Sequence, residues 1–309
     1  MKAAATAHAN IALVKYWGKR DEARMLPEAG SLSIALDKLR TTTTVELGSF
    51  PADSLILDSR EQDPARARAL LDAAGISQRA RIVSHNEFPT AAGLASSASG
   101  FAALAVAACA AAGLRKTEEE LSALARQGSG SAARSVPGGW AVWESESSRQ
   151  VFAPSHWDLR FCIAVCAEGA KQVGSRDGMR ATRETSPYHG AWIAQCRRDL
   201  PAALHLLAAR DLPGLGALAE RNALRMHADA LAADPPLLYW QPATVACLQA
   251  LGELRSNGIQ AWPTIDAGPH VVAICAPADA DAVEARLRSV PGVTELLRCA
   301  PAGGATLLP

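Results

Sequence analysis

Residues 89–100 read PTAAGLASSASG and run directly into FAALAVAACAAAGL, residues 101–114. The Ala-rich second run predicts a helix, and Ser96, Ser97 and Ser99 supply hydroxyl groups where it opens. Small residues let the backbone approach a ligand, while successive N–H groups and the positive helix end favour a phosphate. The segment lacks the GxxxxGK[ST] spacing of the common nucleotide-binding loop. It therefore indicates either a phosphate-binding helix start or a helix start whose small residues simply pack closely.

Strand patterns precede this segment, and a second helix follows it. Residues 11–17, 31–47 and 80–88 are predicted strands, because β-branched residues or alternating apolar positions favour an extended chain. After the Ala-rich helix, Thr117 and Glu120 have the spacing of a capping box, which predicts the start of another helix. The first part of the chain is therefore expected to mix strands and helices.

The second half of the chain changes from short strands to long helices. Strands are predicted within residues 136–145 and 160–169. Beyond Glu184, the predicted elements are three long helices, a strand, a helix and a last strand: residues 190–211, 212–234, 242–258, 264–276, 278–290 and 305–309. We expect an α+β fold in two lobes, residues 1–184 and residues 185–309, with the site in the cleft between them.

Composition excludes several classes of protein. The 309 residues carry 31 Lys and Arg against 31 Asp and Glu, so no general nucleic-acid or membrane-surface binder is expected. The longest apolar run is shorter than the roughly 18–20 residues that span a bilayer. Asn10 and Lys15 interrupt the apolar residues near the N-terminus, so no export signal is expected either. We expect a cytoplasmic protein without membrane or nucleic-acid partners.

The cysteines point in the same direction. There are seven, an odd number, without CxxC or Cys/His ligand spacing, and most stand among apolar residues. Buried reduced thiols are therefore expected rather than a zinc site or a disulfide framework.

Two further segments carry residue types suited to anions and proton transfer. In GSGSAARSVPGG, residues 128–139, Ser129 and Ser131 offer hydroxyls and Arg134 can hold a carboxylate or phosphate through two hydrogen bonds. The alternative is an ordinary Gly/Ser loop with a solvated arginine. In TIDAGPH, Asp266 follows a predicted strand, where its carboxylate is either a general base or hydroxyl-orienting group, or closes an Asx turn.

Weaker signals come from two other places. Ser175 and Arg176 in QVGSRDGM form a possible anion clamp, although an exposed loop arginine is the better interpretation of that segment taken alone. Only six of the 31 basic residues are lysines, and Lys15 and Lys19 lie four apart in ANIALVKYWGK. In a chain that uses arginine almost everywhere, these lysines indicate a need for a compact ammonium group.

Taken together, the motifs resemble one known family. The blocks ANIALVKYWGKRD, PTAAGLASSASG, GSGSAARSVPGG, SRDGM, LRMHA and TIDAGP occur in the order seen in diphosphomevalonate decarboxylases. These belong to the galactokinase, homoserine, mevalonate and phosphomevalonate kinase superfamily, and the resemblance runs from about residue 7 to the end. It implies an N-terminal ribosomal-protein-S5-domain-2-like lobe and a C-terminal ferredoxin-like α/β lobe, with a cleft between them.

The resemblance also implies site residues, cofactors and partners. The expected ATP-binding residues are Pro89, Ala92, Gly93, Leu94, Ala95, Ser96, Ser97 and Ser99. The expected substrate-binding residues are Asn10, Tyr16, Lys19, Ser129, Ser131, Arg134, Ser175 and Arg176. Asp266, Arg134 and Lys15 are implied as catalytic. The family uses ATP with Mg²⁺, for which Ser97 is a candidate ligand, and tends to form homodimers.

The implied activity is ATP-dependent decarboxylation of (R)-5-diphosphomevalonate to isopentenyl diphosphate, with ADP, phosphate and CO₂, in the mevalonate route to isoprenoids. One alternative is a decarboxylase of 5-phosphomevalonate or a mevalonate 3-kinase on the same scaffold. A second is a non-catalytic nucleotide- or metabolite-binding protein. The chain departs from the family pattern at the run Glu28, Ala29 and Gly30 in LPEAGSLS, at Ala133 and at His270.

Overall fold

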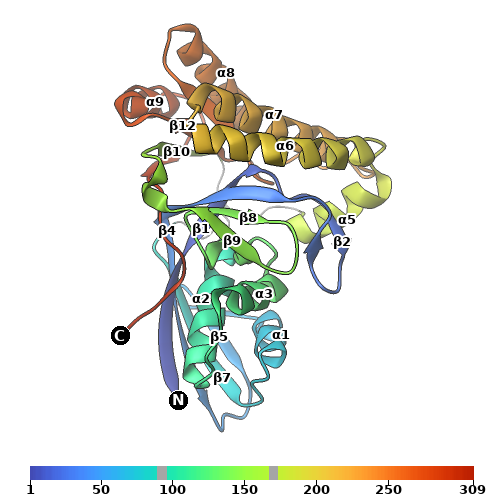
Figure 1. Cartoon of the computed structure of the whole chain (residues 1–309), viewed down its shortest axis with the longest axis vertical. Coiled ribbons are helices and arrows are strands. Elements are labelled where there is room, and N and C mark those ends of the chain that lie inside the picture. Colours follow the sequence, from blue (N-terminus) through green and yellow to red (C-terminus); the bar gives the residue numbers. More distant parts are fainter. Residues whose placement is uncertain (89–95, 167–172) are drawn as a thin grey trace.

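The computed structural model describes residues 1–88, 96–166 and 173–309 (Figure 1). The residues Pro89, Ala92, Gly93, Leu94 and Ala95, predicted to bind ATP, lie outside the described residues. Within the described ranges, a large mixed sheet forms the base of one lobe and an antiparallel sheet forms the base of the other.

The large sheet has the strand order β14-β1-β4-β7-β5-β6, and β8 pairs with both β4 and β9. These strands are β1 Lys2–Val14, β4 Ser31–Gly48, β5 Ser54–Leu57, β6 Arg60–Gln62, β7 Arg79–Asn86, β8 Trp140–Trp143, β9 Ser148–Phe152 and β14 Thr306–Leu307. The chain thus returns at its end to the first lobe, because β14 pairs with β1.

The two halves of strand β4 differ in how they are buried. Residues 31–36 are buried on both faces, whereas residues 41–48 alternate between buried and partly exposed positions. Such alternation is expected for a strand with one face in the core. On the buried face, Thr41 and Thr43 bond to side chains of the neighbouring β7 and of the overlying helix. The fully buried first half is where the second lobe packs.

Helices cover one face of this sheet: α1 Ala65–Ala73, α2 Ser96–Ala111, α3 Glu118–Gly128 and the short α4 Ala132–Ser135. Helix α2 is rich in alanine, which lets it pack closely against β1 and β4. The capping box predicted for the next helix is present, since the Thr117 side chain accepts from the Glu120 N–H and Glu120 reaches back to the Thr117 N–H.

The second sheet has the order β11-β12-β10-β13, all antiparallel. Its strands are β10 Arg160–Val165, β11 Ala261–Thr264, β12 Val271–Cys275 and β13 Glu295–Cys299. Read from β13, the order is fourth, first, third, second along the chain, the arrangement of a ferredoxin-like sheet. This result agrees with the fold that the resemblance implied.

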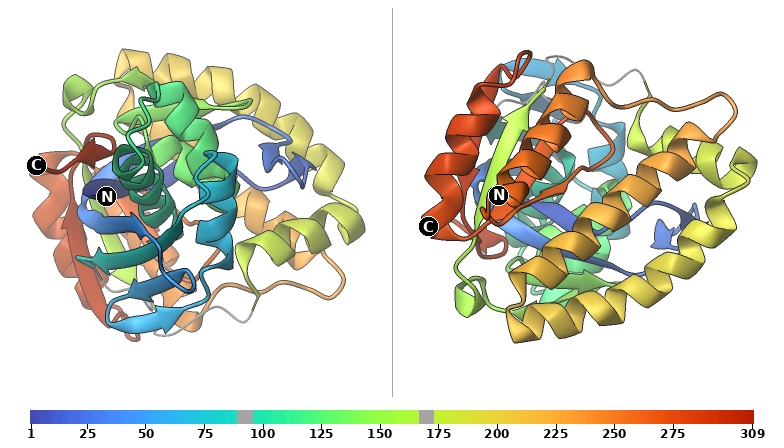
Figure 2. Two further views of the ribbon diagram at one scale, coloured as in Figure 1. Left: turned by 90° about the horizontal axis from the view of Figure 1, so that it is seen from below. Right: turned by 90° about the horizontal axis from the view of Figure 1, so that it is seen from above.

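Further helices connect the strands of this lobe: α5 Ser175–Thr185, α6 His189–Ala209, α7 Leu212–Leu231, α8 Pro242–Ser256 and α9 Ala280–Arg288. Helices α8 and α9 pack against the second sheet. Helices α6 and α7 lie side by side across the top of the first lobe (Figure 2). Their apolar side chains share one core with β1, β4, β10 and β12.

The lobe boundary expected at residue 184 stays a prediction, but the strand pairing favours an earlier position. Strand β10 belongs to the second sheet although it precedes residue 184, the expected boundary. The change at residue 184 marks the start of long helices, whereas sheet membership depends on pairing with distant strands. We propose a boundary between Phe152 and Arg160 instead.

Two local predictions also change. The strand predicted over residues 11–17 ends at Val14, so Lys15, Tyr16 and Trp17 leave the sheet. Ser175 and Arg176 open helix α5 rather than lying in a loop.

The predictions for thiols and for membrane-spanning helices can also be compared with the structure. The seven cysteines are free and buried, as predicted: Cys109, Cys162, Cys166, Cys196, Cys247, Cys275 and Cys299. Across residues 1–88, 96–166 and 173–309, no helix has the length and apolar character needed to cross a membrane.

Candidate active site

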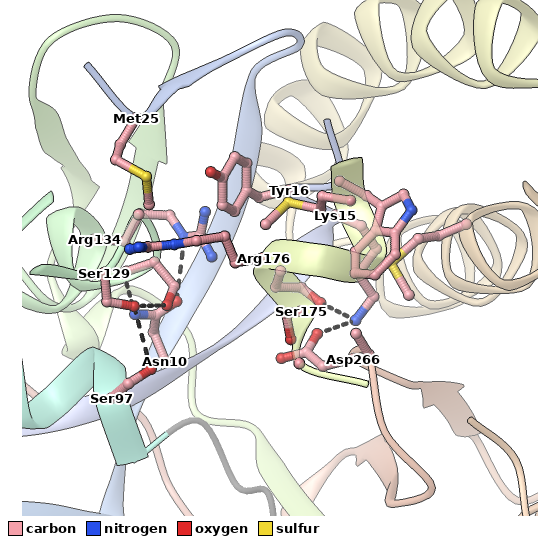
Figure 3. Close-up of a pocket in the computed structure, with 18 of the residues that line it drawn as sticks. Asn10, Lys15, Tyr16, Met25, Ser97, Ser129, Arg134, Ser175, Arg176 and Asp266 are labelled. Carbon is pink, nitrogen blue, oxygen red and sulfur yellow. Dashed lines mark hydrogen bonds and ion pairs between the residues drawn. The ribbon is translucent and has the colours of Figure 1, made fainter. Parts of the chain in front are cut away.

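A cavity of about 510 Å³ lies where the two lobes meet (Figure 3). Its walls come from the end of β1, the first turns of α2 and α5, the α3–α4 connection, helices α1 and α7, and the turn after β11. Ten residues predicted to act in the site line it: Asn10, Lys15, Tyr16, Ser97, Ser129, Ser131, Arg134, Ser175, Arg176 and Asp266. Segments far apart in the sequence thus converge on one space.

An ion pair between the lobes lines the cavity. Lys15 Nζ lies 2.5 Å from Asp266 Oδ1, and it also donates to the Ala12 carbonyl at 2.7 Å. The Lys15 side chain is 2% exposed and that of Asp266 is 38% exposed. Burial lowers the pKa of Lys15, and the neighbouring Asp266 carboxylate opposes that effect. The carboxylate is therefore held by a cation yet open to a ligand.

Helix α7 holds this pair from behind. Asn222 Oδ1 accepts a hydrogen bond from the Lys15 backbone N–H at 2.8 Å. His227 Nε2 lies 3.1 Å from the Asp266 carbonyl oxygen. Burial, followed by the charge of Lys15, lowers the pKa of His227 to about 4, so the neutral ring donates its N–H to that carbonyl. Sequence reasoning assigned neither residue a role, and the available signal was a polar side chain on the buried face of a helix.

One wall of the cavity includes Arg134, whose side chain is buried. Its Nε lies 3.0 Å from Ser33 Oγ and 3.2 Å from Asn10 Oδ1, and Nη1 donates to Ser31 Oγ at 2.7 Å. In the described part of the chain, no carboxylate lies within ion-pair distance of it. Burial lowers the pKa of Arg134 to about 10, so it stays cationic at neutral pH. A buried cation held by uncharged groups is suited to an incoming anion.

Serine hydroxyls form a second wall. Ser129 Oγ lies 3.2 Å from Ser97 Oγ and 3.3 Å from Ser131 Oγ. Of the hydroxyls predicted at the start of α2, Ser97 lines the cavity, whereas Ser99 is fully buried with its Oγ 2.6 Å from Thr41 Oγ1. Residues two apart on a helix point about 200° away from each other, so Ser97 and Ser99 serve different faces. Ser96 is half-buried and does not line the cavity either.

Two further arginines add positive charge to the cavity. Ser175 and Arg176 open α5, and Arg66 comes from α1. Arg66 lies over the Phe101 ring, 4.7 Å from its centroid, and its pKa is lowered by burial and by Arg176. In the part of the chain described, neither arginine has a carboxylate within ion-pair distance. Nothing in the local sequence around Arg66 distinguishes it from a surface helix residue.

Tyr16 lies beside Arg134, because its ring packs 4.7 Å from the ring of Trp143, over which Arg134 also lies. Its hydroxyl is buried and has no hydrogen-bond partner among the described residues. Burial raises the pKa of the Tyr16 phenol, so the group stays protonated and keeps a proton to donate. An unpaired buried donor beside unpaired cations is what an anionic ligand would satisfy.

Lys19 and His270 lie elsewhere. Lys19 is fully buried in an ion pair with Glu22 at 2.5 Å and does not line the cavity, so the structure does not bring it to the predicted substrate site. His270 Nδ1 accepts a hydrogen bond from the Cys166 N–H at 3.1 Å. It supports the start of the chain segment after β10 rather than the cavity wall.

The side chains available as ligands determine how Mg²⁺ could bind. No cluster of three or more His, Cys, Asp or Glu suited to a metal occurs within residues 1–88, 96–166 and 173–309. Magnesium in phosphoryl-transfer sites is bound by one or two protein groups together with substrate phosphates. The Ser97 hydroxyl beside a cationic cavity fits that mode, in which the metal arrives with the nucleotide.

The fold and this cavity define the class: a two-lobed protein of the galactokinase, homoserine, mevalonate and phosphomevalonate kinase superfamily. Residues 7–153 match the model of the diphosphomevalonate decarboxylase-like N-terminal domain, and residues 161–299 match that of the mevalonate 5-diphosphate decarboxylase C-terminal domain. The chain belongs to the diphosphomevalonate decarboxylase family.

Individual relatives agree over nearly the whole length. The diphosphomevalonate decarboxylase of Gibberella zeae is 37% identical over 320 residues, covering 91% of this chain and 83% of that protein. A solved structure of MDDEF in complex with MVAPP, AMPPCP and magnesium has a TM-score of 0.93 and 36% identity, covering 100% of this chain and 99% of that one. Mevalonate diphosphate decarboxylase from Staphylococcus aureus has a TM-score of 0.93 and 34% identity, covering 100% and 98%.

Proposed function

We propose that this chain catalyses the ATP-dependent decarboxylation of (R)-5-diphosphomevalonate to isopentenyl diphosphate, with ADP, phosphate and CO₂ as the other products. The observation that carries the proposal is the charge pattern of the cavity. Arg134, Arg66 and Arg176, none with a carboxylate within ion-pair distance among the described residues, line the cavity together with the Lys15–Asp266 pair. A substrate with a carboxylate, a central hydroxyl and a diphosphate matches that pattern.

Arg134 binds the substrate carboxylate. Its Nε and Nη1 are held by Ser31, Ser33 and Asn10, which fixes the plane of the guanidinium. An arginine fixed in this way presents its remaining N–H groups to a carboxylate in one orientation. The carboxylate is thereby held in the plane required for its loss as CO₂.

Asp266 orients and deprotonates the tertiary 3-hydroxyl. The hydroxyl oxygen attacks the terminal phosphorus of ATP, the bond between that phosphorus and ADP breaks, and a 3-phosphate forms. The C3–O bond then breaks with its electrons leaving on phosphate, so positive charge builds at C3. The electrons of the bond between the carboxylate and C2 fill the new C2–C3 double bond, and CO₂ departs. Asp266 passes its proton to the departing phosphate, and the resulting carboxylate stabilises the electron-deficient carbon while Lys15 holds it in place.

The diphosphate end of the substrate is bound by Tyr16, Ser175, Arg176 and Arg66. Two guanidinium groups without carboxylate partners offset charge that would be costly to bury alone. The Tyr16 hydroxyl adds a buried donor whose proton is retained. Lys19 contributes to this end only through the backbone segment it anchors, because its ammonium is engaged by Glu22.

ATP binds on the side of α2. The expected phosphate-binding residues end at the first turn of this helix, where Ser97 borders the cavity and Ser129 and Ser131 extend the row of hydroxyls. Bound Mg²⁺ would neutralise nucleotide phosphate charge, with Ser97 as the protein group that would hold it. A complex of a relative with AMPPCP and magnesium supports ATP and Mg²⁺ as the ligands.

The decisive experiment supplies pure protein and Mg-ATP with mevalonate, its 5-phosphate or its 5-diphosphate, and follows ADP and CO₂ separately. Equal amounts of ADP and CO₂, formed only with the diphosphate, are expected. ADP without CO₂ would instead identify a 3-kinase on this scaffold, and equal kcat/KM for all three substrates would remove the case for a diphosphate site. Absence of both products would favour a non-catalytic binding protein.

The cytoplasmic location, which rests on composition, and the homodimer, which rests on the family resemblance, stay proposals. Sedimentation equilibrium of the purified chain measures the second directly. A mass near twice 32.3 kDa is expected.

A further inference from the structure

A second group of titratable side chains lies outside the cavity lining, and the proposed reaction does not use it. His189, the first residue of α6, has Nδ1 2.8 Å from Asp229 Oδ2 and Nε2 3.3 Å from Glu28 Oε2. Asp229 belongs to α7 and is fully buried, while Glu28 lies between the short strands of the β2–β3 hairpin and β4. Glu28 is one of the positions at which this chain departs from the family pattern.

The geometry defines the charge of the imidazole. Both ring nitrogens face carboxylate oxygens, and a neutral imidazole has a single N–H to donate. Only the doubly protonated ring donates to both carboxylates. Asp229 Oδ1 has no hydrogen-bond partner among the described residues, so this buried carboxylate depends on His189 for its counter-charge.

The surrounding charges agree with that state. Burial lowers the pKa of His189, but the hydrogen bonds and charges of Asp229 and Glu28 outweigh burial, so the net pKa is raised. On α5, Arg183 Nε lies 3.8 Å from Glu28 Oε2, and on α6, Arg197 donates to the Glu28 carbonyl at 3.5 Å. The Cys196 thiol, two turns along α6, stays neutral because burial raises its pKa.

Glu28, His189 and the following turn of α6 contact the chain shortly after Lys15. Gly18 packs against the ring, since a Cβ built there would lie 3.1 Å from His189 Cε1. Its carbonyl accepts the Glu28 N–H at 3.1 Å. Further along α6, Trp192 Nε1 donates to the Trp17 carbonyl at 2.9 Å. The first turns of α6 therefore hold the backbone next to Tyr16 from the outside.

The same contact reaches Arg134. The segment held by Glu28, here called the strap, comprises residues 18–30 and includes β2 Lys19–Asp21 and β3 Leu26–Pro27. Figure 1 shows the strap, labelled at β2, beside α5 and below the first turns of α6. Met25 of the strap lines the cavity. Ser31, the first residue after the strap, accepts a hydrogen bond from Arg134 Nη1. The strap therefore lies in the chain between Tyr16 and Ser31, the hydrogen-bond partner of Arg134.

We propose that Glu28, His189 and Asp229 form a positioning triad that clamps the strap to α6 and α7 and thereby sets how tightly Tyr16 and Arg134 hold the substrate. His189 is a positioning residue, because it touches no reacting group. When the imidazole loses its proton, one carboxylate loses its donor, the strap loosens and substrate binding weakens. The kinetic part of this inference rests on the proposed function, whereas the charge state of the triad does not.

The charge state is tested first, without any assay of activity. Nitrogen-15 NMR of the histidine rings is expected to show His189 with both nitrogens protonated at pH 7.5, its signals assigned by their loss in His189→Gln. The exposed His205 on the same helix provides the internal comparison. A neutral His189 ring at that pH would overturn the proposal even if the enzyme is active.

The kinetic test separates positioning from a structural role. His189→Gln is expected to raise KM for the diphosphate substrate about tenfold with kcat within about threefold, the scale of one lost charge-assisted contact. In the parent, KM rises as the pH passes above the His189 pKa, and in the variant that rise disappears. His205→Gln is the matched control and should change neither value. An unchanged KM, or an unchanged pH profile in folded His189→Gln, refutes the positioning role.

Glu28→Gln provides a second test in case His189→Gln does not fold. Glu28 is partly exposed, and glutamine keeps the shape of its side chain. The variant should weaken substrate binding about threefold and shift the His189 titration to lower pH, in proportion to one lost carboxylate. An unshifted titration would also refute the triad. If the parent lacks decarboxylase activity, the NMR result still decides the triad while the proposed function fails.

Discussion

Lys15 and Asp266, 251 positions apart in the chain, meet at 2.5 Å across the junction of the two lobes. Lys15 follows the last residue of β1 in the first lobe, and Asp266 follows β11 in the second. Because the lysine is buried and the carboxylate is open to the cavity, the pair directs an oriented acceptor toward the substrate. The lobes must be correctly assembled for either residue to act.

Removing the carboxylate tests the centre of the mechanism. Asp266→Ala is expected to lower kcat by roughly a thousandfold or more, the scale of losing a key electrostatic group in a site. ATP binding, measured by calorimetry, should survive, since Asp266 does not lie on α2. Activity within tenfold of the parent would contradict the role assigned to Asp266.

Arg134 is expected to need its guanidinium and not merely its charge. Arg134→Lys keeps a cation but loses the planar fork, and it should lower kcat/KM by about 100-fold, consistent with a lost bidentate contact. The ratio of CO₂ to ADP is the second readout, because a misaligned carboxylate slows decarboxylation more than phosphoryl transfer. The exposed Arg149→Lys provides the control. Parent kinetics in Arg134→Lys would rule out a bidentate contact.

Arg66 should affect the diphosphate more than other parts of the substrate. Arg66→Gln is expected to raise KM for the 5-diphosphate by about tenfold and to change kcat little, as for one lost charge-assisted contact. Steady-state kinetics with the 5-phosphate as the comparison should show a smaller change. Equal effects on both substrates would mean that Arg66 supports the fold and not the diphosphate.

Acid should destabilise the protein through His227. Its pKa in the folded state, about 4, lies below the ordinary value of 6.5, so the unfolded chain binds more protons between these two values. The free energy of unfolding should therefore fall by about 1 kcal/mol per pH unit from pH 6.5 toward pH 4. Urea unfolding between pH 4.5 and 7.5 measures this slope. His227→Gln should flatten it, and an unchanged slope in that variant would contradict the buried neutral ring.

Much of the fold follows from local pattern. The long strand β4, the Ala-rich helix α2, the capping box at Thr117 and the long helices α6 to α8 all occur where the residues predict them. Periodicity and capping depend on neighbours within a few residues, so they can be read directly. Strand β10 was recognised as a strand, but its sheet was not, because pairing with β12 and β13 is a long-range property.

The residues of the site also divide into those that the sequence predicts and those that only the structure reveals. Arg134, Asp266 and Lys15 could be named from ordered motifs that resemble a family, and each lines the cavity. Arg66 and Asn222 could not, because their segments look like ordinary helix and only packing brings them to the site. His227 lies in the LRMHA block, but the block gave it no role, and only the structure shows its contact with Asp266. Lys19 shows the reverse, since its motif predicts a ligand contact while the fold engages its ammonium with Glu22.

By itself, the sequence determined the identity and order of the chemical groups: serine hydroxyls before a helix, an arginine after Gly/Ser residues, and an aspartate after a strand. Only the tertiary structure decided which of these groups share a cavity and what charge each one meets there. The reason is physical: residue type sets what a side chain can donate, accept or ionise, whereas burial and partners set whether it does. The triad of Glu28, His189 and Asp229 exists only through that second step, because its members come from three separate segments.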